Sequence, residues 1–249
     1  MKEQKGFLEI DGQSIYYEYF LKNFPNKATI VLLHEGLGSV AQWKDIPQKI
    51  YQNTDYQVLV YDRSGYGISS MPKADYPSDY LRYEAQIMLP ELLNKLSIKK
   101  CALFGHSDGA SIALLFAAYF PQRCSYVFSE AAHVVIEDIS RQGISRVRKI
   151  YTKKLQKPLQ KYHGEKADWV FYHWADTWLH KDNHQWNMIE ELKNISCPLV
   201  AIQGDKDEYG SPYQLALIQD NCTLAQTHLL KDCGHIPHFE AWQQVEALL

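Results

Sequence analysis

The sequence lacks the features of a membrane-spanning or repeat-built protein. No stretch approaches about 18 consecutive apolar residues, the length at which a transmembrane helix would be suspected. The first six residues are polar and charged with no apolar run behind them, so no secretory signal is predicted. Internal repeats and low-complexity segments are also missing. We therefore expect a cytoplasmic globular protein that does not engage a membrane.

Cysteine is scarce, and its distribution excludes two common site types. The five cysteines are an odd number, widely scattered, and contain no C-x-x-C pair, so neither a disulfide framework nor a zinc site is indicated. His180 and His184 are spaced as helical metal ligands often are, but the glutamate of the metalloprotease motif and a clear third ligand are lacking. We predict no metal and no organic cofactor.

A strong charge of one sign is missing as well. The formal charge of −3 gives no global reason to expect a nucleic-acid or anionic-membrane partner, so a small-molecule substrate is the expected partner. One local basic run lacks acidic residues and could attract an anion, although a solvated helix face is the favoured interpretation. Its members are Arg141, Arg146, Arg148, Lys149, Lys153, Lys154, Lys157 and Lys161. No oligomeric state is predicted.

The order of hydrophobic patterns indicates a mostly parallel sheet. Asp11-Gly12 is a strong hairpin signal between two strand-like runs, 7–10 and 14–20. Helical patterns such as 80–96 separate several of the later apolar runs, which implies a sheet covered on both faces. The expected later strands are 29–33, 57–61, 101–104, 125–129, 198–202 and 225–230. With 249 residues, one domain carrying an insertion is expected.

The insertion is the interval from about Ala132 to Ile195, where no strand pattern is found. We predict a helical cap there, with an α/β core formed by residues 1–131 and 196–249. Because active sites of open parallel sheets lie at the carboxyl ends of the strands, both ends of this cap should emerge beside the site. Its second half is crowded with aromatic residues, namely Trp169, Tyr172, Trp174, Trp178 and Trp186.

A G-x-S-x-G motif follows the expected strand 101–104 and precedes an apolar helix-like run from Ala110 to Tyr119. A serine at such a sharp turn is held in a strained conformation that projects its Oγ atom, and the flanking glycines allow close backbone approach. The motif reads Gly105-His106-Ser107-Asp108-Gly109. Ser107 is therefore the predicted nucleophile.

A serine hydroxyl needs a base, usually histidine, and that base is oriented by an acid. Among ten histidines His235 is favoured, because it follows the expected strand 225–230 and so lies on the same rim as Ser107. His238, three residues later, is the alternative. Several carboxylates qualify as the acid, but Asp205 and Asp207 alone follow immediately after a strong buried strand, 198–202. Glu130, at the end of the strand before it, is a third option.

These motifs together resemble the α/β-hydrolase superfamily over essentially the whole chain. The chain is similar in layout to small serine esterases, valacyclovir-hydrolase-like enzymes and carbon–carbon bond hydrolases of that superfamily. The matching segments are the elbow motif, His34-Glu35-Gly36-Leu37-Gly38, Asp62-Arg63-Ser64-Gly65-Tyr66-Gly67, Gly204-Asp205-Lys206-Asp207 and Gly234-His235. The resemblance implies an α/β-hydrolase fold with a cap after strand 6, and it favours Asp207 as the acid.

The resemblance also implies where an oxyanion would bind. Two backbone N–H donors are expected, one from Asp108 and one from Gly36 in the loop after the third strand. Relatives usually have glycine where this chain has Glu35, and a carboxylate there would oppose catalysis unless it points away or is paired with a cation. The residues expected to line the substrate pocket are Glu35, His106, Trp169, Trp174 and Trp178.

The leading functional hypothesis is therefore a carboxylesterase-like serine hydrolase that acts through an acyl-enzyme. A hydrolase of carbon–carbon bonds in β-diketones or ring-cleavage products, using the same three residues, is the first alternative. A ligand-binding relative without efficient turnover is the second, and Glu35 is the residue that keeps it open.

Overall fold

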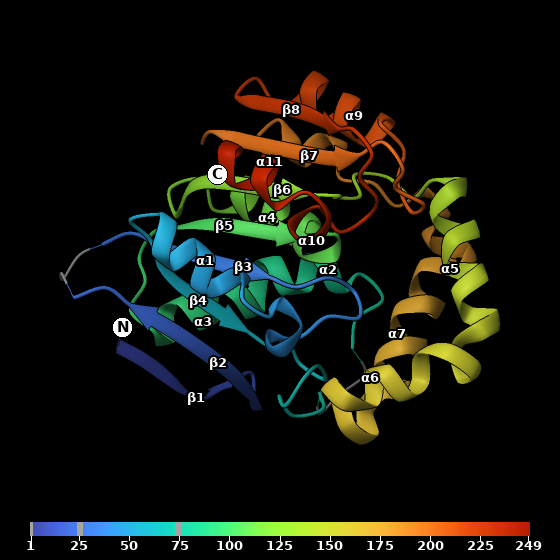
Figure 1. Ribbon diagram of the computed structural model, residues 1–249, viewed down its shortest axis with the longest axis horizontal. Coiled ribbons are helices and arrows are strands. Elements are labelled where there is room, and N and C mark those ends of the chain that lie inside the picture. The colour runs from blue at the N-terminus through green and yellow to red at the C-terminus, as the bar shows by residue number, and fades with distance from the viewer. Residues whose placement is uncertain (1, 24–26, 73–75) are drawn as a thin grey trace.

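The computed structural model describes residues 2–23, 27–72 and 76–249 and is built on an eight-stranded sheet in the order β1-β2-β4-β3-β5-β6-β7-β8 (Figure 1). β1 and β2 pair antiparallel, β2 pairs antiparallel with β4, and all later pairs are parallel. The strands are β1 (Lys2–Ile10), β2 (Gln13–Leu21), β3 (Thr29–Leu33), β4 (Gln57–Tyr61), β5 (Cys101–His106), β6 (Cys124–Glu130), β7 (Leu199–Gly204) and β8 (Ala225–Leu230). The predicted fold class is confirmed.

The opening hairpin turns where the sequence predicts it. Asp11 and Gly12 have φ angles of 48° and 69°, the left-handed pair that a two-residue type I′ turn requires. β1 begins at Lys2, five residues before the expected strand start at Phe7, because every residue from Lys2 to Ile10 pairs with β2. The charged residues at its start are exposed at the sheet edge, where charge discourages pairing with another chain.

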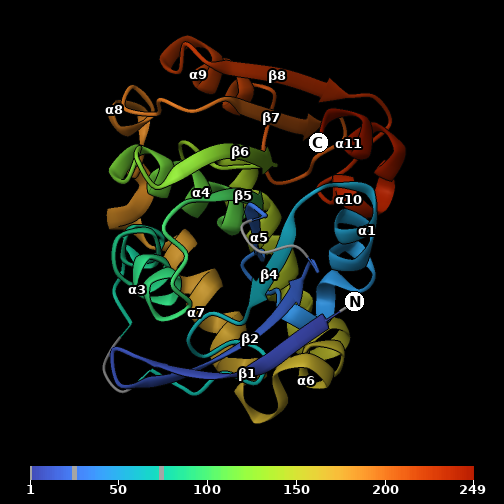
Figure 2. The same ribbon diagram turned by 90° about the vertical axis from the view of Figure 1, so that its left-hand side faces the viewer.

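Alternating side chains of the parallel strands fill two separate cores. Val31 and Leu33 pack on one side of the sheet, and Ile30 and Leu32 pack on the other. Figure 2 shows α3, α4 and α9 on the first side, and α1, α10 and α11 on the second. The covering helices are α1 (Ile46–Asn53), α2 (Tyr80–Tyr83), α3 (Leu89–Lys95), α4 (Asp108–Tyr119), α9 (Tyr213–Asn221), α10 (Pro237–Glu240) and α11 (Trp242–Leu248). Among the described residues, no helix is both long and apolar enough to pass through a bilayer.

The segment expected as one helix over 80–96 is helical but not uniform. Between α2 and α3 lies a π-helical turn, Glu84–Met88. Pro90 follows it and has no N–H group to donate to the carbonyl four residues earlier, so the regular hydrogen-bond ladder cannot continue through this point.

The insertion after β6 is helical, as predicted. It contains α5 (Asp138–Ile150), a π-helical turn (Tyr151–Leu155), α6 (Gln156–His163), α7 (Ala167–Leu179) and α8 (Ile189–Leu192). In Figure 1, α5, α6 and α7 stand beyond the carboxyl ends of the parallel strands. Residues 132–195 are all described, and their extended pairing is limited to one isolated bridge, between Val135 and Asn187.

Candidate active site

Ser107 lies at the turn between β5 and α4 with φ 54° and ψ −117°, a conformation rarely adopted by a residue with a side chain. Two glycines make this turn possible. A Cβ atom on Gly105 would lie 2.3 Å from the Gly109 carbonyl oxygen, and one on Gly109 would lie 1.9 Å from the Leu33 carbonyl oxygen. The strained turn is thus retained by close packing of α4 against β3 and β5.

The structure brings together the three side chains that the sequence analysis selects. The His235 Nε2 atom lies 3.1 Å from Ser107 Oγ, and its Nδ1 atom lies 2.8 Å from Asp207 Oδ2. Asp207 is ionised in this arrangement and can only accept, so Nδ1–H is the donor to it. The neutral imidazole then presents the lone pair of Nε2 to the Ser107 hydroxyl.

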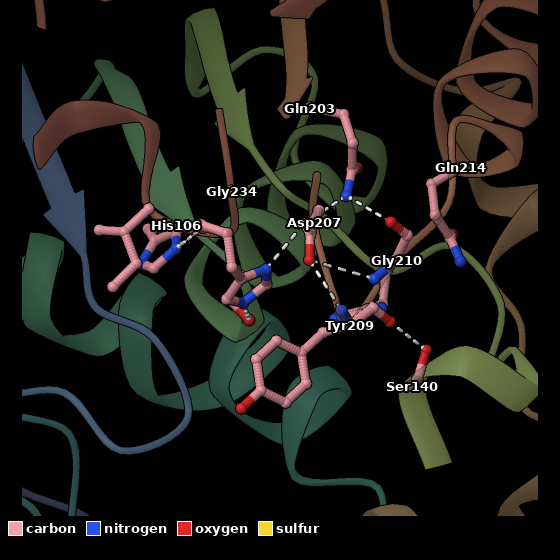
Figure 3. Close-up of polar contacts among 12 residues, drawn as sticks. His106, Ser140, Gln203, Asp207, Tyr209, Gly210, Gln214 and Gly234 are labelled. Atoms are coloured by element: carbon pink, nitrogen blue, oxygen red, sulfur yellow. Dashed lines mark hydrogen bonds and ion pairs between the residues drawn. The ribbon is translucent and has the colours of Figure 1, made fainter. Parts of the chain in front are cut away.

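Hydrogen bonds from its own loop hold the Asp207 carboxylate (Figure 3). Oδ1 accepts the backbone N–H groups of Tyr209 at 2.8 Å and Gly210 at 3.3 Å, and Oδ2 also accepts the Gln203 side-chain amide. Burial alone would raise the pKa of Asp207, but the hydrogen bond and charge of His235, helped by the Tyr209 N–H, outweigh it and hold the pKa below its usual value. Asp205, the competing acid, is exposed and accepts the Cys233 N–H.

The charge of Asp207 acts on His235 in return. Burial tends to lower the pKa of the imidazole, but the hydrogen bond and the charge of Asp207 reverse that effect and raise it above 6.5. Glu35 and Glu208 add smaller contributions in the same direction. His235 is therefore a stronger base than a free histidine.

The two other residues weighed for these positions are paired with each other. His238 Nδ1 lies 2.6 Å from Glu130 Oε2, and both side chains are buried. The His238 ring meets the His106 ring edge to face with 4.9 Å between centroids, and His106 Nε2 lies 2.7 Å from the His235 carbonyl oxygen. This second imidazole–carboxylate pair thus lies behind the loop that carries His235.

Glu240 is a positioning residue that the sequence analysis missed. Its carboxylate accepts the N–H of Gly234 at 2.6 Å and the N–H of Ile236 at 3.0 Å, the residues on either side of His235. The sequence does contain a signal for this role, because Glu240 follows the turn at His235 by five residues. A carboxylate at such a distance can reach back to free backbone N–H donors. Glu240 fixes the backbone from which His235 projects.

The loop after β3 is shaped by its glycine. A Cβ atom on Gly36 would lie 2.4 Å from the Trp174 indole and 3.0 Å from Asp108 Oδ2, so no side chain fits there. Leu37 N–H donates to Glu35 Oε2 at 2.9 Å, and Gly38 N–H donates to the Glu35 carbonyl at 3.0 Å. The Gly36 N–H forms no hydrogen bond with any residue that the structure describes.

Arg63 supplies a buried positive charge beneath this loop, with only 2 % of its surface exposed. Its Nη2 donates to the Glu35 carbonyl oxygen at 2.8 Å, and its Nη1 lies 3.6 Å from Asp108 Oδ2. Tyr80 also donates its hydroxyl to Asp108. Burial raises the pKa of Asp108 and of Glu35, and Arg63 opposes that rise in both.

A cavity of about 150 Å³, here called the Ser107 cavity, lies above these groups. Its lining includes four of the five predicted pocket residues, Glu35, His106, Trp174 and Trp178. The other lining residues are Leu37, Ser107, Asp108, His133, Ser140, Ile144, Tyr209, His235 and Ile236. Over the described ranges, no three histidine, cysteine or acidic side chains converge as metal ligands would.

The predicted pocket role of Trp169 does not agree with its position. The Trp169 ring covers Gly65, where a Cβ atom would lie 2.1 Å from the ring, and it stacks on His173 with 4.8 Å between centroids. It also meets Tyr66 and Tyr76 edge to face. Helical periodicity turns Trp169 toward the core loops, whereas Trp174 and Trp178, one turn apart, face the cavity.

His163 at the end of α6 ties the cap to the loop beside Gly36. Its Nδ1 accepts the Gly67 N–H at 2.9 Å, and its Nε2–H donates to the Leu37 carbonyl at 3.0 Å. Burial is the main reason that its pKa falls to about 4, so the ring stays neutral and can both donate and accept. The sequence offered no local signal for this contact, because its partners are distant in the chain.

A sequence model of the α/β hydrolase fold family matches residues 28–161, which are more than half of the chain. The chain belongs to the α/β-hydrolase fold family. This match includes the loop after β3, the elbow at Ser107 and the start of the cap.

Individual relatives extend the likeness over nearly the full chain. Human serine hydrolase BPHL is 27% identical over 243 residues, covering 92% of this chain and 79% of that protein. Proline iminopeptidase of Lactobacillus helveticus is 21% identical over 284 residues, covering 98% of this chain and 96% of that protein. The solved enol-lactonase of Burkholderia xenovorans LB400 shares the fold with a TM-score of 0.74 at 20% identity, covering 97% of both chains. These named relatives are hydrolases of the superfamily, and the chain is a hydrolase-family member.

Replacement of Gly109 by alanine should destabilise the protein, because its methyl group would overlap the Leu33 carbonyl. We expect the free energy of unfolding to fall by about 2 kcal/mol or more, as for other overpacked sites, measured by urea denaturation. Gly6→Ala is the control, since its added Cβ would meet nothing closer than 3.7 Å. Equal stability of the two variants would contradict the close packing at the elbow.

Proposed function

We propose that this protein is a serine hydrolase that cleaves a carboxylic ester or related acyl bond through an acyl-enzyme. The observation that carries the proposal is the hydrogen-bonded series Ser107, His235, Asp207, with contacts of 3.1 and 2.8 Å. Nothing else in the Ser107 cavity combines a nucleophile with an oriented base. The likeness to human serine hydrolase BPHL supports the same class of chemistry.

In the acylation step, Ser107 Oγ attacks the substrate carbonyl carbon while its proton passes to His235 Nε2. The new Oγ–C bond gives a tetrahedral oxyanion. When that intermediate collapses, the bond to the leaving oxygen breaks and His235 gives its proton to that oxygen. Asp207 stabilises the imidazolium that exists between the two proton transfers.

In the deacylation step, water takes the place of the alcohol. His235 removes a proton from water as the water oxygen attacks the acyl carbon, and the bond to Ser107 Oγ then breaks with return of the proton to Oγ. The carboxylic acid leaves and the three side chains return to their starting state.

The oxyanion would be held by the backbone N–H groups of Gly36 and Asp108. In a trans peptide the carbonyl and the following N–H point in opposite directions, and the described chain has no cis peptide. By binding the Glu35 carbonyl, Arg63 therefore turns the Gly36 N–H to the opposite side of that peptide. The same guanidinium lies 3.6 Å from the Asp108 carboxylate, so one buried cation both holds the Glu35 carbonyl and offsets a nearby acid.

The acyl group would occupy the Ser107 cavity against the cap. Trp174 and Trp178 are 8 % and 3 % exposed and supply apolar walls, and Ile144 lies beside them. Glu35 and His106 complete the polar part of the pocket in this proposal. The cap would therefore select the acyl group, while the residues that follow the ends of the strands would carry out the reaction.

Ser107→Ala should abolish ester hydrolysis and covalent labelling by a fluorophosphonate, because both require the Oγ atom. Asp207→Asn should lower kcat by about 10⁴-fold, since an asparagine amide favours the wrong tautomer of His235, whereas Asp205→Asn should change kcat little. Turnover of an ester, thioester, amide and β-diketone panel is the measurement.

Labelling that survives in Ser107→Ala would overturn the assignment of the nucleophile. Equal losses in the two asparagine variants would overturn the assignment of the acid. Turnover confined to β-diketones, with normal labelling, would replace the ester reaction by carbon–carbon cleavage with the same residues.

The pH profile should have an acid limb set by His235, because only the neutral imidazole can accept the Ser107 proton. The pKa of His235 in the folded protein lies above its usual value of 6.5, so kcat/KM should fall as pH decreases through the pKa of His235. Glu35→Gln removes a negative charge that raises this pKa, so the acid limb should move to lower pH. Glu190→Gln, at an exposed position of α8, is the control. An acid limb that stays in place or moves upward in Glu35→Gln would contradict the proposed charge coupling.

Arg63→Lys tests the positioning of the oxyanion donors while keeping the charge. A lysine cannot present two nitrogens in a fixed fork, so we expect kcat to fall by about 10²-fold with little change in KM. Steady-state kinetics on one ester, with urea denaturation of the same protein, separates this loss from unfolding. A raised KM with unchanged kcat would show that Arg63 serves substrate binding instead.

A further inference from the structure

A second cavity, here called the side cavity, adjoins the Ser107 cavity. It has a volume of about 240 Å³. The two cavities share three lining residues, Glu35, His106 and Ile236. Because Glu35 follows β3 and Ile236 follows His235, the side cavity borders the proposed oxyanion loop on one side and the base on the other.

Aromatic rings make up much of the side-cavity wall. They belong to Trp43, Tyr162, His238 and Phe239, with His34 and His106. The His238 ring lies 4.9 Å from the Trp43 ring and 4.4 Å from the Phe239 ring, measured between centroids. Such a wall suits a flat aromatic group, which gains both apolar burial and ring–ring contacts.

The buried His238–Glu130 pair gives this wall a fixed polar point. Glu130 is fully buried, and its Oε2 holds His238 Nδ1 at 2.6 Å. Within the described ranges, the His238 ring forms this one hydrogen bond, which leaves its other nitrogen, Nε2, available to a bound group. An unpaired carboxylate would be strongly destabilising at a buried position. Here Glu130 is paired with His238, and the pair fixes the orientation of an imidazole that lines the side cavity.

The two cavities differ in their exposure to solvent. Phe239, which lines only the side cavity, is 40 % exposed, and Lys44 at its edge is also exposed. The cap walls of the Ser107 cavity, Trp174 and Trp178, are almost fully buried. An acyl-enzyme releases its alcohol first and keeps its acyl group, so the alcohol needs its own route to solvent.

We propose that the side cavity binds the leaving group of the substrate, and that this group is an aromatic alcohol. This inference rests on the proposed acyl-enzyme function and adds the substrate class: aryl esters, with the acyl group under the cap and the aryl group between Phe239, Tyr162 and His238. The aryl group binds during acylation and is gone before deacylation begins.

Two ester series measure the two sites separately. One series keeps the acetyl group and varies the alcohol from methyl through phenyl to 1-naphthyl. The other keeps 4-nitrophenol and varies the acyl group from acetyl through butyryl to benzoyl. Because each variant is compared with the wild type on the same ester, the intrinsic reactivity of the ester cancels. kcat/KM reports acylation, and rapid-mixing bursts resolve acylation from deacylation.

Phe239→Ala and Tyr162→Ala should each lower kcat/KM for naphthyl acetate relative to methyl acetate by about tenfold, as expected from the loss of one aromatic contact. Both should leave the acyl ranking and the deacylation rate unchanged, a result that a general loss of structure would not produce. Trp174→Ala should do the reverse and change only the acyl ranking. Phe7→Ala, a 54 % exposed residue of β1, is the matched control and should change neither series.

Three outcomes would overturn the inference. A changed acyl ranking in Phe239→Ala and Tyr162→Ala would assign the side cavity to the acyl group. Unchanged behaviour in both variants would remove the side cavity from substrate binding, with the proposed function intact. Absence of an acetyl-enzyme burst in the wild type, together with absent fluorophosphonate labelling, would instead overturn the proposed function itself.

Discussion

The close approach of α4 to the third strand is the contact on which the rest of the site depends. At Gly109 the helix backbone comes so near the Leu33 carbonyl that a single methyl group would not fit. This contact forces the chain to reverse at Ser107, and it holds the loop that begins at His34 against the start of α4. In the proposed function, the Ser107 hydroxyl and the N–H groups of Gly36 and Asp108 are thereby positioned before any substrate binds. Strain at one residue is offset by packing along a buried helix.

The balance of charge around Ser107 is the second constraint on the active site. Glu35, Asp108 and Asp207 all lie near Ser107, and ionised carboxylates would repel a developing oxyanion. The negative charge of each acid is offset by a different arrangement of groups. His235 is paired with Asp207, and Arg63 is paired with Asp108 and also binds the Glu35 carbonyl. The Glu35 carboxylate accepts the Leu37 N–H, and the charges of His235 and Arg63 oppose the rise in its pKa that burial causes.

Features that depend on short-range sequence patterns, such as strand bounds and motif residues, are predicted well from the sequence. β3, β4 and β8 have the expected bounds. Motifs and strand ends select Ser107 and His235, and the family resemblance selects Asp207 over Asp205. What the sequence missed depends on contacts between distant segments. The His163 bond to Leu37 spans 126 positions, and the Arg63 bond to Glu35 spans 28. Composition could count the cap aromatics but could not give their directions, which is why Trp169 was assigned to the pocket.

The first cap helix also contacts the loop that carries the acid, so the cap is more than a cover. Ser140 Oγ donates to the Tyr209 carbonyl at 2.5 Å, and the N–H of Tyr209 in turn binds the Asp207 carboxylate. Just before α5, Glu137 accepts the Ser211 N–H at 3.0 Å. Movement of α5 would therefore act on the same backbone that orients Asp207. In the proposed function the cap selects the acyl group, so these hydrogen bonds couple the segment that selects a substrate to the segment that orients the base. A change in the cap would then alter both specificity and the basicity of His235.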